Sequence, residues 1–348
     1  MTMNRHLTLT LAAISMLGAF GATGSMRAQQ PAPAAPPLEV LKVQGNVYLL
    51  AGAGGNIAVQ VGREGVLLVD TGLAASAPRM MAEVRKLSAG PIRWIINTHL
   101  HPDHWGGNEA IAGLPPDTLA PLKIAAHENM LNRLTTAEAT ARAPEVQRGL
   151  PYNEYFTPTK DVYFNGEAVV LYHEPKAHTD GDTVVLFRGS DVVSTGDIFT
   201  PGGYPFIDID NGGSVKGEID ALNHILQLTV PEKTQEGGTY VIPGHGRICD
   251  EADVVEFRDM VVIIRDRIQD AINKRMTLDQ VKAARLTRDY DTQYVSPTSF
   301  VTTDRFVEAV YKSLSQASAP ARGPAAPAAP GNRGQTPGNR GQAPAGRR

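Results

Sequence analysis

Three of the nine histidines of this 348-residue chain lie within six positions, in the stretch THLHPDHWGG (98–107), together with one aspartate. The stretch follows the apolar run IRWII (92–96), which is typical of a buried β-strand. The fold must therefore present four polar side chains of metal-ligating types where a strand gives way to a loop. Composition constrains much less, because 42% hydrophobic and 20% charged residues are ordinary for a soluble globular protein.

The four side chains fall into two pairs. His99 and His101 alternate along an extended segment, so both point to the same side and can bind one ion. Pro102 forces a turn, which can redirect Asp103 and His104 toward a second ion. Nearby histidines alone are more often surface or core residues, so a metal site needs support from elsewhere in the chain.

Three further ligand types occur far along the chain, each in a turn at the edge of an apolar strand and close to glycine. His178 lies in KAHTDGDTVV, Asp197 ends VVSTGD, and His245 lies at the end of YVIPGHG. One such position would mean little, because histidine and aspartate often end strands. Three of them, added to the cluster, form a repeated pattern that predicts one shared metal site.

The order of elements predicts an α+β fold. Short apolar runs separated by Gly and Asn in 38–70 indicate antiparallel strands joined by tight turns. A helix at 77–88, the strand 92–96 and a helix around 128–142 follow, and strands resume before residue 200. Later helices are expected at 215–228 and within 251–274, 278–286 and 303–314. This order fits a four-layer αββα sandwich, in which two mixed β-sheets pack face to face with helices on both outer faces.

The motifs LLVDTG, THLHPDH, AHTDGDT, STGD and PGHG, in this order, resemble the metallo-β-lactamase fold superfamily of hydrolases over residues 46–245. The resemblance implies that one metal ion is bound by His99, His101 and His178. It implies that a second ion is bound by Asp103, His104 and His245, and that Asp197 bridges the two. Asp70 matches an aspartate that hydrogen-bonds and orients ligand histidines.

Asp197 sets this chain apart from the best-known β-lactamases of the superfamily, which have cysteine or no bridging ligand at that position. An aspartate at this position resembles the pattern of the thioesterase, lactonase, sulfatase and phosphodiesterase branches. This resemblance implies a dinuclear site. Diiron oxygen reductases of this fold have glutamate at the position of His101, where this chain keeps histidine. Mononuclear iron dioxygenases keep the HxHxDH pattern, so iron stays open as an alternative.

Neutral imidazoles and carboxylates suit zinc, and two divalent ions ~4 Å apart can share a hydroxide with a near-neutral pKa. The predicted cofactor is therefore two Zn²⁺ ions per chain, with iron and manganese left open. Asp103 is the predicted catalytic residue, placed to orient the nucleophile or to pass a proton to the leaving group. Tyr204 and Phe206 are predicted to line the substrate pocket. Donation from Tyr204 to a developing oxyanion and simple loop packing are equal alternatives.

Both ends of the chain differ from its centre. Residues 1–28 combine Arg5, an apolar run and small residues, which indicates a signal peptide and a periplasmic or secreted protein without stable membrane insertion. A disordered Pro/Ala linker is predicted at 29–37, the hydrolase domain at 38–315, and a disordered Pro/Ala/Gly/Arg tail at 316–348, whose partner is unknown.

Charge argues against nucleic acid as a partner. The first 28 residues hold two arginines and the tail five, and neither region contains an acid. The segment between them is therefore more acidic than the net charge of −3 of the whole chain, and it would repel a phosphate backbone.

The sequence thus predicts an exported dinuclear zinc hydrolase that cleaves a small ester, lactone, thioester or amide-like substrate, with β-lactams as one option. Two alternatives stay open at this point. One is an iron-dependent sulfur (persulfide) dioxygenase, and the other is a periplasmic accessory protein that binds a metabolite or cofactor through the same site.

Overall fold

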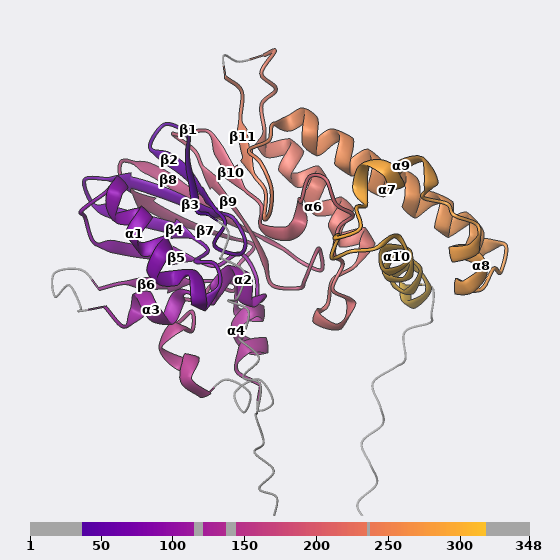
Figure 1. Cartoon of the computed structure of the whole chain (residues 1–348), viewed down its shortest axis with the longest axis horizontal. Helices are drawn as coiled ribbons and strands as arrows, with labels where there is room; N and C mark the ends of the chain where they lie inside the picture. Colours follow the sequence, from indigo (N-terminus) through magenta and orange to yellow (C-terminus); the bar gives the residue numbers. More distant parts are fainter. Residues whose placement is uncertain (1–36, 115–120, 137–143, 235–236, 318–348) are drawn as a thin grey trace, which may run out of the picture. The chain divides into compact units, whose positions relative to one another are not determined.

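The described residues form two β-sheets (Figure 1). The computed structural model describes residues 37–114, 121–136, 144–234 and 237–317. In the first sheet the strands follow the order β1-β2-β3-β4-β5-β6, antiparallel from β1 to β4 and parallel from β4 to β6. They are β1 (Glu39–Gln44), β2 (Val47–Ala51), β3 (Ile57–Gly62), β4 (Gly65–Val69), β5 (Ile92–Ile96) and β6 (Lys123–Ala125).

The second sheet has the order β11-β10-β9-β8-β7, in which only β10 and β11 pair in parallel. Its strands are β7 (Thr159–Phe164), β8 (Glu167–Glu174), β9 (Asp182–Phe187), β10 (Val192–Ser194) and β11 (Tyr240–Ile242). Both sheets therefore mix parallel and antiparallel pairs, which confirms the predicted mixed sheets.

The central strand β4 shows why its sequence is apolar throughout. Leu67 and Val69 belong to the core between the two sheets, together with residues of β8 and β9. Val66 and Leu68 belong to a second core on the outer face of the first sheet. Because successive side chains of a strand point to opposite faces, a strand covered on both faces reads as a continuous hydrophobic run.

Helices cover the outer face of each sheet. The α-helices are α1 (Ala77–Leu87), α2 (Pro102–Trp105), α3 (Asn108–Ala112), α4 (Glu128–Leu134), α6 (Val215–Leu228), α7 (Glu251–Asn273), α8 (Leu278–Ala283), α9 (Arg288–Tyr294) and α10 (Thr303–Ala317). Short 3₁₀ turns are η1 (Ala74–Ser76), η2 (Pro144–Gly149), η3 (Gly196–Ile198) and η4 (Ile209–Asn211). Met80 and Val84 of α1 and Ile111 of α3 pack on the first sheet. The four-layer αββα architecture is confirmed.

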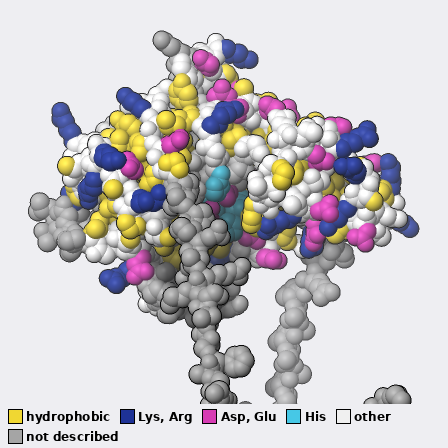
Figure 2. Space-filling view, viewed as in Figure 1, with side chains coloured by type: hydrophobic (Ala, Val, Ile, Leu, Met, Phe, Trp, Pro, Cys, Tyr) yellow, Lys and Arg dark blue, Asp and Glu magenta, His cyan; other side chains and the backbone are white. Residues whose placement is uncertain are grey.

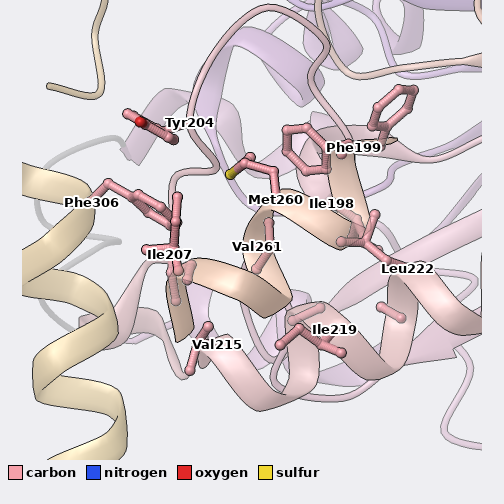
Figure 3. Close-up of a cluster of buried hydrophobic side chains, with 14 of the residues drawn as sticks. Ile198, Phe199, Tyr204, Ile207, Val215, Ile219, Leu222, Met260, Val261 and Phe306 are labelled. Carbon is pink, nitrogen blue, oxygen red and sulfur yellow. The ribbon is translucent and has the colours of Figure 1, made fainter. Parts of the chain in front are cut away.

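The helices on the second sheet enclose the largest apolar cluster. Leu222 of α6, Met260 and Val261 of α7 and Phe306 of α10 converge in it with Phe199, which follows the strand β10 (Figure 3). This cluster anchors the segment after β10 to three helices. The position of that segment matters because it carries residues of the predicted site.

The predicted boundaries differ from the structure at two places. The helix expected around 128–142 ends at Leu134, and residues 137–143 lie outside the described residues. Helix α10 continues to Ala317, past the predicted domain end at 315. The predicted signal peptide, the linker up to residue 36 and the tail from 318 also lie outside the described residues. In the described part of the chain, no helix is both long and apolar enough to cross a bilayer.

The topology brings the predicted ligand segments to one edge of both sheets. The loops after β4, β5, β10 and β11 leave the carboxyl ends of strands that run in parallel pairs. The turn with His178 precedes β9, which is antiparallel to β10, so that turn lies at the same edge. Segments far apart in the sequence therefore meet in space, as expected for sites at strand ends.

Core packing in the helical layer predicts a mutational cost. Leu222 is fully buried between the second sheet and the helices. Leu222→Ala should lower the free energy of unfolding by about 2–5 kcal/mol, through lost burial and the cavity left behind. Urea denaturation followed by circular dichroism measures this loss.

Ile263→Ala is the matched control, because Ile263 lies on α7 but is 38% exposed. Its cost should stay within about 1 kcal/mol. Equal costs at the two positions would contradict the described packing of α6.

Candidate metal centre

All seven predicted ligand residues lie together in two groups. His99, His101, His178 and Asp197 form the first group, and Asp103, His104 and His245 form the second. Within each group one ligand atom per residue lies within 4.8 Å of the others. Pro102 begins helix α2 while His101 before it is extended, which separates the two pairs of the HxHxDH stretch as predicted.

Asp197 faces both groups. Its Oδ1 lies 3.2 Å from His104 Nε2 and 3.5 Å from His245 Nε2. Its Oδ2 lies 3.9 Å from the Nε2 atoms of both His99 and His178. Each carboxylate oxygen is therefore directed at a different group.

Asp70 fixes the tautomers of two histidines. Its Oδ2 accepts from His104 Nδ1 at 2.7 Å and from Thr98 Oγ1 at 2.7 Å. Because the Thr98 hydroxyl donates to Asp70, its oxygen can accept from His99 Nδ1, which lies 3.0 Å away. Both imidazoles thus carry their proton on Nδ1 and present an Nε2 lone pair to the site.

His101 and His178 are oriented by a neighbouring loop. His101 Nε2 donates to Asp208 Oδ2 at 2.9 Å, and His178 Nδ1 donates to the Phe206 carbonyl. These bonds leave lone pairs on His101 Nδ1 and His178 Nε2, which face each other at 2.9 Å. Two facing lone pairs repel unless a cation or a proton lies between them, which fits a shared metal ion.

Unpartnered buried atoms give a second test of fit. Among the described side chains, His99 Nε2 and Asp197 Oδ1 are buried without a hydrogen-bond partner. Buried polar atoms are normally satisfied, so such atoms need an explanation. Imidazole nitrogen and carboxylate oxygen are ligands that zinc accepts, and these residues therefore fit a divalent ion.

The electrostatics also favour bound cations. Burial, together with repulsion from His104 and His178, holds the pKa of His99 well below its ordinary value. Burial lowers the pKa of His178 to about 4, so both imidazoles stay neutral, as metal ligation requires. The pKa of His104 is raised well above its ordinary value because the Asp197 and Asp70 carboxylates outweigh the opposing effect of burial. The carboxylates of Asp197 and Asp70 thus draw positive charge into the site.

Two glycines leave room for the ligands. A Cβ on Gly244 would lie 2.0 Å from Asp197 Oδ1, and a Cβ on Gly55 would lie 2.4 Å from His104 Cε1. Asn56 holds the His245 loop in place, because its Nδ2 donates to the carbonyls of Pro243 and Gly246. Glycine is therefore needed where the backbone passes closest to the ligand side chains.

A pocket of about 570 Å³ opens over the two groups. Figure 2 shows histidine side chains, with acidic side chains beside them, at the bottom of a hollow in this face. The second group is the more accessible, since the His245 and Asp103 side chains are 42% and 33% exposed, whereas those of His99 and His178 in the first group are at most 1% exposed. The wall is apolar and is formed by Pro201, Tyr204, Phe206, Phe300 and Val301.

Phe206 and Tyr204 contribute differently to this wall. The Phe206 ring stacks on His101, with ring centroids 5.6 Å apart. Tyr204 lines the pocket but is only 2% exposed, and its hydroxyl lies 2.9 Å from Asp291 Oδ1. The hydroxyl is therefore engaged with Asp291, which favours the packing alternative for Tyr204, and its ring stacks on Tyr294 and Phe306.

Sequence reasoning missed Asp208 and Phe300. Asp208 lies in the acidic segment FIDID, two residues after Phe206, but no ligand spacing marks it. Phe300 is nearly a hundred residues from Phe206 in the chain, and only the tertiary fold brings their rings to 5.3 Å. The signal in the sequence that could have indicated Asp208 is the short distance along the chain between the FIDID segment and Asp197.

Comparison with known proteins agrees with this geometry. A family model described as the metallo-beta-lactamase superfamily matches residues 42–245, more than half of the chain. The chain belongs to the metallo-beta-lactamase superfamily. The match ends at His245, so it spans every predicted ligand.

Two of the proteins that this chain is similar to are alkylsulfatases. The linear primary-alkylsulfatase of Pseudomonas sp. (strain ATCC 19151) is 38% identical over 74 residues, which are 21% of this chain and 14% of that protein. The stereoselective inverting sec-alkylsulfatase Pisa1 from Pseudomonas sp. has a TM-score of 0.61 at 18% identity, over 79% of this chain and 50% of that one. This chain thus matches at most half the length of either sulfatase.

A metallo-beta-lactamase from Hirschia baltica has a TM-score of 0.50 at 20% identity, over 65% of this chain and 98% of that one. At these identities, the similarity to the solved superfamily structures shows the shared fold.

The position of Tyr204 predicts a separation of stability from activity. Tyr204→Phe keeps the stacked ring but removes the bond to Asp291, so the free energy of unfolding should fall by about 1 kcal/mol. The kcat for any substrate that the metal-loaded protein hydrolyses should stay unchanged. A fall of about 10²-fold in kcat, typical of a lost oxyanion donor, would contradict this assignment.

Gly244→Ala should weaken zinc binding at least about tenfold, because the added Cβ displaces the Asp197 carboxylate. Competition with a chromophoric chelator measures the affinity, and melting of the metal-free protein shows whether the fold survives. In the control Gly113→Ala, the added Cβ comes no closer than 3.3 Å to any atom. Equal affinities of the two variants would count against the close approach at Gly244.

Proposed function

We propose that this protein is a metal-dependent hydrolase that binds two zinc ions and cleaves the ester bond of a small substrate with an uncharged apolar group. The observation that carries the proposal is the pair of ligand groups on either side of Asp197, at the base of an apolar pocket. Membership of the metallo-beta-lactamase superfamily and the similarity to alkylsulfatases support a hydrolase.

The two ions have defined protein ligands in this proposal. His99, His101 and His178 would hold the first ion, and Asp103, His104 and His245 would hold the second, with Asp197 available to both. Once bound, two zinc ions would supply a nucleophile from water near neutral pH and withdraw charge from the bond that breaks.

The chain itself contributes proton transfer and positioning. Asp103 Oδ2 lies 3.2 Å from His245 Nε2, and the Asp103 side chain is 33% exposed toward the pocket. Asp103 can therefore hold a proton between the site and the bound substrate, or orient the attacking water. The aromatic wall at Phe206 and Phe300 would shield one side of a bound substrate from water.

The pocket wall supports an apolar substrate. Neither Lys nor Arg occurs among the described residues that line the pocket, and the guanidinium of Arg305 beside them lies over the Phe206 and Phe300 rings. The lining itself is therefore suited to an apolar group rather than to a charged one. An alkyl sulfate ester fits this pattern, because its anionic end would meet the metal ions and its alkyl chain the aromatic wall. A β-lactam antibiotic carries a carboxylate beside the reacting ring, so it fits less well.

We further propose that the protein is exported to the periplasm or secreted, and that it acts on small molecules rather than on nucleic acid. The N-terminal charge and apolar pattern support export. Cell fractionation followed by N-terminal sequencing of the mature protein tests it. A mature protein that retains residues 1–28 in the cytoplasm would contradict export.

Metal analysis combined with a substrate panel tests the hydrolase proposal. The panel holds alkyl sulfates, p-nitrophenyl acyl esters, lactones, acyl thioesters, a chromogenic cephalosporin, a penicillin and a carbapenem. The expected result is about two zinc ions per chain and kcat/KM rising roughly fourfold per added methylene over short chains. Iron with oxygen uptake on a persulfide would replace the proposal with the dioxygenase. Bound zinc without turnover on the whole panel would favour the binding protein.

Asp103→Asn should separate the roles of the two ions. The variant should retain about one zinc per chain instead of two and lose at least about 10²-fold in kcat/KM, because an amide is a poor ligand and holds no proton. Asp279→Asn, on an exposed position of α8, is the control. Wild-type activity of Asp103→Asn would contradict the assigned role of Asp103.

A further inference from the structure

His101 is held in a different way from the other ligands of the first group. His99 and His178 donate from Nδ1 and present Nε2, whereas His101 donates from Nε2 to Asp208 and presents Nδ1. The two tautomers of imidazole are close in energy in water, so the bond to Asp208 selects the one that faces the ligand group. Asp208 is itself buried, with 8% exposure.

A chain of hydrogen bonds holds Asp208 from behind. Its Oδ2 accepts from Asn211 Nδ2 at 2.8 Å and its Oδ1 from Asn211 N at 3.1 Å. Asn211 Oδ1 accepts in turn from Arg133 Nη1 at 3.2 Å. Arg133, on α4, also forms a bidentate pair with Asp180, with N–O distances of 2.7 and 2.6 Å. Such a fork is geometrically specific, so it fixes the guanidinium.

The same segment is tied to the turn that carries His178. Asp208 N donates to the His178 carbonyl at 2.9 Å, and Asp180 N donates to the Asn211 carbonyl at 3.0 Å. Arg133 therefore joins two segments, the one that orients His101 and the one that carries His178. Neither Arg133 nor Asn211 belongs to the two ligand groups.

We propose that Asp208 is a positioning residue for the first metal ion and that Arg133 holds it in place through Asn211. Asp208 keeps the proton of His101 on Nε2, so that Nδ1 is directed at the ion. This inference rests on the metal site of the proposed function. It adds that contacts from α4 help to select the tautomer of His101. Without it, His101 could adopt the tautomer that turns an N–H toward the ion.

Asp208 also caps the turn η4, since its side chain accepts from the Asn211 amide. A purely structural role would therefore show as a loss of stability in the metal-free protein. A positioning role would show in metal binding and in the ligand field of the first ion. The experiment must read these effects separately.

Asp208→Asn is the direct test. An amide can donate to His101 Nε2 and so favour the wrong tautomer, while it preserves the size of the side chain. Affinity for the first zinc ion, measured by competition with a chromophoric chelator, should fall about 10- to 100-fold. The visible spectrum of the protein loaded with one equivalent of Co²⁺ should change in position or intensity. Wild-type affinity together with a wild-type Co²⁺ spectrum would overturn the proposal.

Arg133→Met tests the outer part of the chain of bonds without touching a ligand. It should lower the affinity for the first zinc ion about three- to tenfold. This effect is smaller than that of Asp208→Asn because Asn211 still reaches Asp208. Arg267→Met is the matched control, since Arg267 bonds the Leu286 carbonyl and Asp289 in the C-terminal helices. Equal zinc affinities of the two Arg→Met variants would remove Arg133 from the proposal.

These readouts are independent of turnover. If the wild-type chain binds zinc but hydrolyses nothing on the panel, the proposed function fails while the positioning role is still measured. If Asp208→Asn binds zinc like the wild type in an active hydrolase, the positioning role fails alone. Wild-type protein that binds neither Zn²⁺ nor Co²⁺ would overturn both.

Discussion

The site depends on one carboxylate, that of Asp197, whose side chain is only 13% exposed. Asp197 lies between four histidines, and its two oxygens are directed at separate ligand groups. A buried carboxylate is costly unless positive charge compensates it, and neutral imidazoles cannot do so. The Asp197 and Asp70 carboxylates hold the pKa of His104 well above its ordinary value despite burial, which shows that the site favours positive charge. Two divalent cations would compensate the same charge with the histidines neutral.

The fold places Asp197 close to the ligand histidines by bringing strand ends together. Asp197 follows β10, His245 follows β11, and the HxHxDH stretch follows β5 in the other sheet. The helical layer on the second sheet then fixes the segment after β10, where Phe199 and Ile207 are buried. Arg305 of α10 reaches the same region, with its guanidinium 4.5 Å from the Phe206 ring centroid. Helix α10 therefore supports the pocket wall. Arg133 of α4 supports the segment that carries Asp208, through its bond to Asn211.

Much of this could be predicted from the sequence, for definite physical reasons. The two mixed sheets follow from continuous apolar runs such as GVLLV, which need cover on both faces. The ligands were found because metal binding demands a small set of residue types at strand ends, close to glycine. Gly244 shows why glycine is close, since any Cβ there would meet Asp197.

The residues that orient the ligands could not be predicted in the same way. Asp208 acts on His101 across more than a hundred positions, and a backbone carbonyl, which has no sequence signature, orients His178. The direction of the Tyr204 hydroxyl depends on Asp291 in α9, which only tertiary packing brings near. Local patterns thus identify ligand types, whereas the tautomers and the pocket wall depend on long-range contacts.

The most direct test of the dinuclear centre is an anomalous difference map at the zinc edge from crystals of the zinc-loaded protein. The account predicts two peaks about 4 Å apart, one beside His99, His101 and His178 and one beside Asp103, His104 and His245, with Asp197 between them. A single peak in either group, or two peaks without Asp197 as a shared ligand, would contradict it.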